Sequence, residues 1–227
     1  MLINARRDLE ERWHDIQLHY SHLLQMEATL QGAATSPIPG ATTRLVEISK
    51  STLALLAYNM IEGVARAILD DIARYVSGDG RKWRHFSDQL GDELMRQILE
   101  GRSTDSKHVL AKRAVLSADK RQTFSLRTDL ILAEAYGNLT FGKLKGCISL
   151  IGVDCQVISA AANSGEDLEF FTIRRNKLAH GNVTFGNYLN SHTASELFRK
   201  CETVKATLDE VLGLVEAAIN NNTLINA

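Results

Sequence analysis

Proline occurs at only two of the 227 positions in this chain, and both, Pro37 and Pro39, lie in one short segment. A proline inside a helix removes a backbone donor and clashes with the preceding turn, so the long stretch after Gly40 lacks the strongest helix breaker. Leu and Ala are common there and runs of β-branched residues are few, which favours helices. The sequence therefore predicts an all-α protein with a sizeable core.

Apolar residues recur at helical spacing in long stretches. From about Ala5 to Leu30 they alternate in steps of four and three, the pattern of a bundle seam, and from about Arg44 to Val76 they mark a central helix. Further helices are expected over 86–99, 141–153 and 194–219, the last capped by Thr193 or Ser195. The residues expected to face inward are Leu9, Trp13, Ile16, Tyr20 and Leu23; Leu53, Leu56, Met60, Val64, Ile68 and Ile72 or Tyr75; and Leu197, Val204, Leu208, Val211 and Val215.

Breaks between these stretches suggest how the chain is divided. Gly32 to Thr43 contains both prolines and is expected to be a loop. We predict an N-terminal helix and loop over 1–43 that packs on the bundle, a helical domain over 44–219, and a frayed tail over 220–227. Residues 107–135 are expected to hold one or two helices whose period is unclear.

Charge is unevenly distributed although the formal net charge is only −1. Thirteen basic residues face eight acidic ones between positions 81 and 145, a mild excess that is compatible with nucleic acid. Within it, Arg81, Lys82, Trp83 and Arg84 are candidate RNA contacts, because a base could stack on the tryptophan while the cations meet phosphates. The alternative is that Trp83 anchors the loop and the charges are merely solvated.

Membrane and secreted proteins do not fit the sequence. The N-terminus is charged and lacks the apolar region of a signal peptide, and polar residues interrupt the longest apolar stretch, Leu53 to Val76. The odd number of cysteines, without metal or redox spacing, predicts buried thiols in a reducing cytoplasm. No cluster has metal-ligand spacing, so we expect neither metal nor cofactor, and His14, His19 and His22 are expected on a solvated face.

One predicted helix ends in an unusual group of residues. It begins near Ser164, and the stretch from Arg174 to Asn182 reads RRNKLAHGN, with Gly181 as a left-handed stop. Arg175 falls on the otherwise apolar stripe, where a guanidinium is costly unless an anion meets it. Asn176 and His180 are four residues apart, so the amide can hold one imidazole nitrogen. Together they suggest a phosphate site with a proton-transfer group.

The motif Arg175-Asn176-x-x-Ala179-His180-Gly181, in a helical chain, resembles the HEPN superfamily of ribonucleases, most closely its short, stand-alone bacterial members. Tyr58-Asn59-x-x-Glu62 and Gly137-Asn138-Leu139 agree with it, and the resemblance covers roughly residues 45 to 215. It implies a HEPN-like helical bundle in which the motif helix precedes a C-terminal helix. It also implies a metal-independent RNA-cleaving site at a homodimer interface, with Arg175 and His180 as its catalytic residues.

Other residues join this site as expectations. Asn176 and Asn182 flank the catalytic pair, and Arg174 and Lys177 are further candidates for RNA contact. Asn59 or Glu62 could orient the motif arginine, although Glu62 could equally form a simple surface pair with Arg66, four residues on. The resemblance further implies a toxin or antiphage-defence effector with an antitoxin or defence partner. Some HEPN proteins carry a modified tyrosine where this chain has Asn182, so that form of inactivation is not expected.

Three functions remain open at this point. The first is the dimeric ribonuclease, which would leave 2′,3′-cyclic phosphate ends on transfer RNA, messenger RNA or a guide RNA. The second is a catalytically silent HEPN module that binds RNA, a nucleotide or a partner protein. The third is a helical interaction protein in which Arg175 and His180 belong to a buried structural network.

Overall fold

The computed structural model describes residues 2–32, 41–77, 86–98, 126–132, 138–155, 164–221 and 224. Those residues form seven α-helices and no β-strand, which confirms the all-α prediction. The helices are α1 (Ile3–Gly32), α2 (Ala41–Ser77), α3 (Asp88–Ile98), α5 (Thr128–Leu132), α6 (Phe141–Leu150), α7 (Ser164–Ala179) and α8 (Ala194–Asn220).

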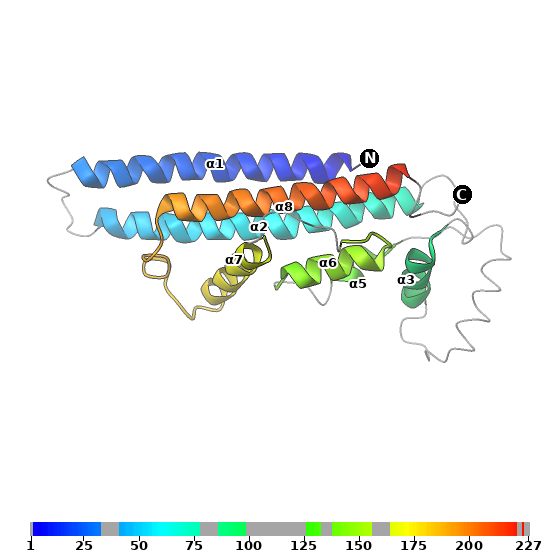
Figure 1. Cartoon of the computed structure of the whole chain (residues 1–227). Coiled ribbons are helices and arrows are strands. Elements are labelled where there is room, and N and C mark those ends of the chain that lie inside the picture. Colours follow the sequence, from blue (N-terminus) through cyan, green and yellow to red (C-terminus); the bar gives the residue numbers. More distant parts are fainter. Residues whose placement is uncertain are drawn as a thin grey trace.

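Three long helices, α1, α2 and α8, lie side by side and run most of the length of the molecule (Figure 1). The α2 and α8 helices run in the same direction and α1 runs against both. The shorter helices lie along one side of α2, and α2 itself contacts α1, α5, α7 and α8. The helix expected to be central therefore does occupy the centre of the bundle.

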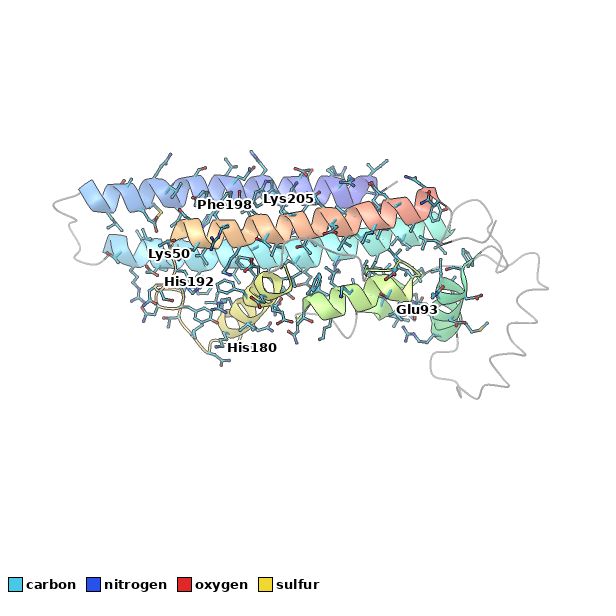
Figure 2. The ribbon with its side chains drawn as sticks, viewed as in Figure 1. Lys50, Glu93, His180, His192, Phe198 and Lys205 are labelled. Atoms are coloured by element: carbon cyan, nitrogen blue, oxygen red, sulfur yellow. The ribbon has the colours of Figure 1, made fainter. Side chains whose placement is uncertain are left out.

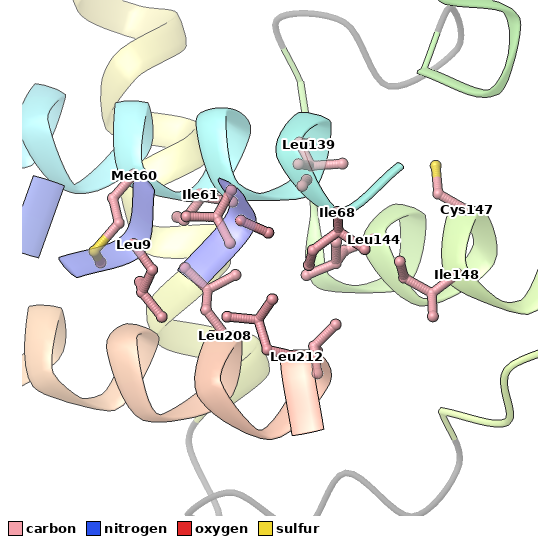
Figure 3. Close-up of a cluster of buried hydrophobic side chains, with 14 of the residues drawn as sticks. Leu9, Met60, Ile61, Ile68, Leu139, Leu144, Cys147, Ile148, Leu208 and Leu212 are labelled. Carbon is pink, nitrogen blue, oxygen red and sulfur yellow. The ribbon is translucent and has the colours of Figure 1, made fainter. Parts of the chain in front are cut away.

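The predicted apolar stripes supply this core. Leu9, Ile16 and Leu23 of α1 are buried, as are all the residues of α8 that were expected to face inward. In α2, Leu56 and Tyr75 are only partly buried, whereas the remaining members of its stripe are buried. Figure 3 shows Leu9, Met60 and Leu208 meeting where the long helices converge, with Leu144 and Ile148 of α6 extending the cluster.

Aromatic stacking joins α1 to α8. The ring of Tyr20 lies parallel to that of Phe198, with centroids 4.0 Å apart, and Trp13 stacks on the same ring at 5.4 Å. Offset stacks of this kind contribute stability beyond the area they bury. The N-terminal helix is thus packed into the bundle.

The polar interruptions of α2 have structural roles that the sequence did not reveal. The carboxylate of Asp71 is buried and accepts hydrogen bonds from the backbone N–H groups of Asn4 and Ala5, each at 3.0 Å. Those groups have no partner within α1, because the first turn of a helix leaves its donors unpaired. Asp71 therefore caps α1 from a neighbouring helix.

By length and composition the segment Thr43–Ser77 could cross a membrane. Many of its apolar side chains, among them Leu53, Ile61 and Ile68, are however buried in the middle of the core. A helix at the centre of a bundle can have the same length and composition, so these two features alone do not identify a membrane span.

Thr193 is the cap of α8. Its hydroxyl accepts a hydrogen bond from the N–H of Glu196 at 3.1 Å, and the Glu196 carboxylate accepts one from the N–H of Thr193 at 2.8 Å. These bonds form a reciprocal capping box. Between the two residues predicted for this role, the structure selects Thr193.

Replacing Thr193 by Ala is expected to lower the free energy of unfolding by about 1 kcal/mol, because the Glu196 N–H loses its acceptor. Urea denaturation followed by circular dichroism measures the change. Thr203→Ala is the matched control, since the Thr203 hydroxyl only bonds back to the Arg199 carbonyl inside the same helix. Equal effects of the two substitutions would contradict the role assigned to the cap.

Two sequence expectations meet a different outcome, and a third is left mostly untested. His19, expected on a solvated face with His14 and His22, is partly buried and its Nε2 lies 2.9 Å from the Ser49 carbonyl oxygen, so it joins α1 to α2. Leu224, in the segment expected to fray, is fully buried, and its carbonyl accepts a hydrogen bond from the Ser87 N–H at 3.0 Å. Most of 107–135 lies outside the described residues, which there contain only α5.

Candidate functional site

The end of α7 fixes the position of His180. Gly181 has φ of +68° and its N–H bonds the Leu178 carbonyl, while the Asn182 N–H bonds the Lys177 carbonyl at 3.0 Å. This pair of bonds is a Schellman motif, which makes His180 the last residue before the left-handed turn. The His180 side chain is exposed, at the end of α7 that lies away from the three long helices (Figure 2). Asn182 contributes to the helix end through its backbone N–H, and its side chain is exposed.

Arg175 occupies the inner side of the same helix. Its guanidinium carbon lies 5.1 Å from the centroid of the Tyr58 ring on α2, and its Nη1 donates to the Asn176 Oδ1 at 3.2 Å. Tyr58 is fully buried, whereas Arg175 is half-buried. The arginine that interrupts the apolar stripe of α7 thus packs on an aromatic face, which reduces the cost of placing a cation there.

Asn176 does not hold the imidazole in the way the spacing suggested. Its Nδ2 donates to the Asn138 Oδ1 at 3.2 Å, and its Oδ1 accepts from Arg175. The amide therefore connects Arg175 to the segment that precedes α6. The reason is geometric, since the segment carrying Asn138 lies against α7 and competes for the amide.

Leu139 fastens that segment to both α2 and α7. Its N–H donates to the Tyr58 hydroxyl at 3.4 Å, and its carbonyl accepts from the Thr172 hydroxyl at 2.8 Å. Burial raises the pKa of Tyr58, the bond from Leu139 lowers it, and the nearby charge of Glu62 raises it. Arg175 therefore packs on a buried neutral phenol of α2. The phenol oxygen accepts a bond from Leu139, which is bonded in turn to α7.

The expectation that Glu62 or Asn59 orients Arg175 stays a prediction. The Glu62 carboxylate lies 3.8 Å from Arg66, the surface pair considered as the simpler alternative, and its charge raises the pKa of Tyr58, the ring on which Arg175 packs. Asn59 is exposed. One residue of this stretch that contacts the motif arginine is Tyr58, which lies next to Asn59 in the sequence.

Arg174 and Lys177 lie on another side of α7, over aromatic rings. The Arg174 guanidinium carbon is 3.7 Å from the Phe170 ring centroid and 5.7 Å from that of Tyr188, and the Lys177 Nζ is 5.8 Å from Tyr188. His192 meets the edge of Phe170, with centroids 5.3 Å apart. The other RNA-contact candidates, Arg81, Lys82, Trp83 and Arg84, lie outside the described residues.

Reasoning from the sequence missed several residues around the motif: Tyr58, Asn138, Phe170, Tyr188 and His192. Tyr58 and Asn138 stood inside stretches already associated with the motif, so their polar side chains beside apolar neighbours were an available signal. The spacing of Phe170 and Arg174, one helical turn apart, also predicts contact. Tyr188 and His192 lie in a loop, where no periodicity reveals which side chains turn toward α7.

The chemistry open to this arrangement follows from the direction of α7. Its C-terminal end presents carbonyl oxygens and the negative pole of the helix dipole, so backbone groups there do not attract a phosphate. Arg174, Arg175 and Lys177 supply the positive charge instead, next to the exposed imidazole of His180. Within the described part of the chain, no three His, Cys, Asp or Glu side chains are placed to hold a metal ion.

Comparison with known proteins agrees with the resemblance found in the motif. The profile of the HEPN_MAE_28990-like HEPN family matches residues 2–224, which includes α1 and therefore extends beyond the part that the motifs suggested. No curated protein and no solved structure matches the chain significantly. A match over nearly the whole chain, together with an all-α bundle and the Arg175–His180 motif at a helix end, places the protein in the HEPN_MAE_28990-like HEPN family.

Proposed function

We propose that the protein is a metal-independent endoribonuclease that cleaves RNA to 2′,3′-cyclic phosphate ends. The observation that carries the proposal is the exposed His180 at the end of α7, five positions after Arg175, in a chain of the HEPN family. Imidazole is the usual group for proton transfer near neutral pH, and the planar guanidinium of arginine suits the oxygens of a phosphate. RNA contributes its own nucleophile, the 2′-hydroxyl, so few further groups are needed.

In this reaction the 2′-oxygen attacks the adjacent phosphorus and the bond to the 5′-oxygen breaks. A base removes the 2′-proton, an acid protonates the leaving oxygen, and positive charge stabilises the phosphorane. We assign His180 to proton transfer and Arg175 to the phosphorane. Asn176 orients Arg175 through the bond of 3.2 Å between them. The products are a 2′,3′-cyclic phosphate and a free 5′-hydroxyl.

A homodimer supplies the second proton-transfer group. Arg175 and His180 are about 140° apart around an ideal helix, and Arg175 is turned toward Tyr58 while His180 is exposed. One chain therefore does not aim both groups at one phosphate. A two-fold axis near the end of α7 brings the same residues from two chains into one cleft.

Cleavage of a defined RNA in EDTA tests the chemistry. We expect the wild-type protein to cut the RNA and to leave a cyclic phosphate and a 5′-hydroxyl, which end-specific ligation and mass spectrometry distinguish from other ends. The same RNA with a single 2′-deoxynucleotide at the cut site is expected to resist cleavage there, because the nucleophile is missing. Cutting at the deoxynucleotide, or a requirement for added metal, would refute the mechanism.

A nuclease of this kind is toxic to the cell that makes it unless it is restrained. We therefore infer a toxin or antiphage-defence effector in the cytoplasm, with an antitoxin or another defence protein as its partner. The three buried free cysteines fit a reducing compartment, and burial raises the pKa of Cys155 to about 11, which makes its thiol inert.

A catalytically silent HEPN module that binds RNA, a nucleotide or a partner protein is the second candidate. It is favoured by the bonds of Asn176, which connect Arg175 to Asn138 instead of orienting His180. A silent module would bind RNA in EDTA without cutting it, so the cleavage experiment separates the two candidates.

A further inference from the structure

A compact group of rings and cations, here termed the basic–aromatic cluster, lies beside the motif and consists of Phe170, Arg174, Lys177, Tyr188 and His192. Arg174 lies on the Phe170 ring at 3.7 Å, and both Arg174 and Lys177 approach the Tyr188 ring, at 5.7 and 5.8 Å. All except the exposed Lys177 are partly buried. The cluster joins α7 to the loop that leads into α8.

The positive charge of this cluster is poorly compensated. The Nε of Arg174 is buried and has no hydrogen-bond partner in the part of the chain that the structure describes. Burial lowers the pKa of Arg174. Burial also lowers the pKa of His192, and the charge of Arg174 lowers it further. Burial alone disfavours any charge, but the effect of Arg174 on His192 is a repulsion between like charges, which an anion placed between them would relieve.

The acidic residues nearby have partners other than the cluster, although the Oε2 atom of Glu47 is buried without a hydrogen-bond partner among the described residues. Asp167 accepts a hydrogen bond from Lys200, Glu196 caps α8 through Thr193, and Glu47 lies 3.0 Å from Lys50. None of them pairs with Arg174 or Lys177 in the described structure. Among the described residues no carboxylate therefore pairs with these two cations, which leaves the cluster open to an anion from another molecule.

The loop that carries Tyr188 and His192 is held in place before any ligand arrives. Leu189 is fully buried, and the Ser51 hydroxyl on α2 donates to the Phe185 carbonyl at 2.7 Å. The Ser191 hydroxyl lies 3.1 Å from the Nδ1 of His192. In Figure 2, His192 lies between α7 and the end of α2, on the same side of the bundle as His180. A preorganised cluster loses little conformational entropy on binding.

The order of residues around α7 connects the cluster to His180. On an ideal helix, Lys177 lies about 60° from Arg174 in one direction and about 60° from His180 in the other. Lys177 therefore lies between the imidazole and the basic–aromatic cluster. A strand whose scissile phosphate is at His180 can follow this surface, with its neighbouring phosphates near Lys177 and Arg174.

We propose that the basic–aromatic cluster is a phosphate-binding subsite for the RNA strand that flanks the scissile bond. The inference rests on the proposed ribonuclease function, which assigns Arg175 and His180 but gives no role to Phe170, Tyr188 or His192. The subsite positions the strand and takes no part in proton transfer.

RNA binding by the inactive His180→Ala protein tests the subsite without cleavage. The probe is a fluorescein-labelled single-stranded RNA of mixed sequence, whose anisotropy is titrated in EDTA at several salt concentrations. Adding Lys177→Gln is expected to weaken binding about threefold to tenfold and to reduce the slope of log K against log salt by about 0.7, the contribution of one phosphate contact on a single strand. Adding Arg174→Gln as well is expected to reduce the slope by about 1.4 in total.

Lys145→Gln in the same background is the matched control. Lys145 also lies over an aromatic ring, that of Phe141 at 5.1 Å, but Phe141 packs by Gly165 at the opposite end of α7. Thermal unfolding of each variant checks the fold. If Arg174→Gln is unstable, the Lys177→Gln variant alone tests the subsite, because Lys177 is exposed. Inorganic phosphate is then added as a competitor. If the cluster is a site for free phosphate, a low phosphate concentration displaces the RNA, whereas a subsite for the strand keeps the RNA bound.

The outcomes separate the subsite from the nuclease. A smaller salt slope in the cluster variants supports the subsite, even if the wild-type protein never cuts RNA and the proposed catalytic function fails. Slopes equal to that of Lys145→Gln overturn the subsite, even if the wild-type protein cuts RNA and the catalytic proposal stands. Binding of inorganic phosphate without binding of RNA also overturns it.

Discussion

The His180→Ala protein is expected to lose about 10²- to 10⁴-fold of its RNA cleavage rate, because a group that transfers protons in the transition state contributes about this much. Its fold is expected to be unchanged, since the side chain is exposed and the helix end is held by backbone bonds of Gly181 and Asn182. Initial rates on one RNA in EDTA, with thermal unfolding of both proteins, measure the two effects separately.

His22→Ala is the control for removing an imidazole. His22 is exposed on α1 and belongs to no part of the motif, so its loss should leave the rate unchanged. A His180→Ala protein that cuts RNA as fast as the wild type would refute the assignment of the site. A loss of rate that accompanies a large fall in melting temperature would instead indicate a structural role.

Replacing Arg175 by Ala is expected to lower the cleavage rate about 10²- to 10³-fold, the usual cost of removing one group that stabilises developing charge. Arg175→Lys should recover little of this loss, because an ammonium lacks the planar fork that meets two phosphate oxygens. Initial rates at saturating RNA concentration measure both variants.

Arg199→Ala supplies the matched control, since Arg199 is an exposed arginine of α8 away from the motif. Arg175 also packs on Tyr58 and bonds Asn176, so its removal could act on the fold alone. That structural reading predicts a lower melting temperature with unchanged RNA affinity and rate. A drop in rate with an unchanged melting temperature would rule it out.

Much of the fold was readable from local pattern. The absence of proline after Gly40 and the apolar spacing in α1, α2 and α8 predicted the three long helices, whose observed ends differ from the expected ones by only a few residues. Such patterns are reliable because a helix buries one apolar stripe, and the residues of that stripe recur at regular spacing in the sequence. The end of α7 was readable for the same reason, since Gly181 alone supplies the left-handed residue.

The surroundings of the motif were only partly readable. The sequence pointed to Asn59 and Glu62 as neighbours of Arg175, which stays a prediction, whereas the fold places the Tyr58 ring against Arg175 and bonds Asn176 to Asn138. Asp71, whose role the sequence did not indicate, and His19, which was expected on a solvated face, bond across α1 and α2. In each case the partner is far away in the sequence and no local pattern identifies it.

The sequence by itself therefore determined the helices, the inward stripes, the motif Arg175–His180 and the family. Only the tertiary structure decided what each polar side chain contacts. Examples are the Tyr58 ring under Arg175, the N-terminus of α1 capped by Asp71, and the basic–aromatic cluster formed by α7 and the loop after it. The physical reason is the separation along the sequence over which each interaction acts. Helix periodicity and capping depend on residues within about four positions, whereas a hydrogen bond or a cation over a ring depends on which elements the packed core brings together.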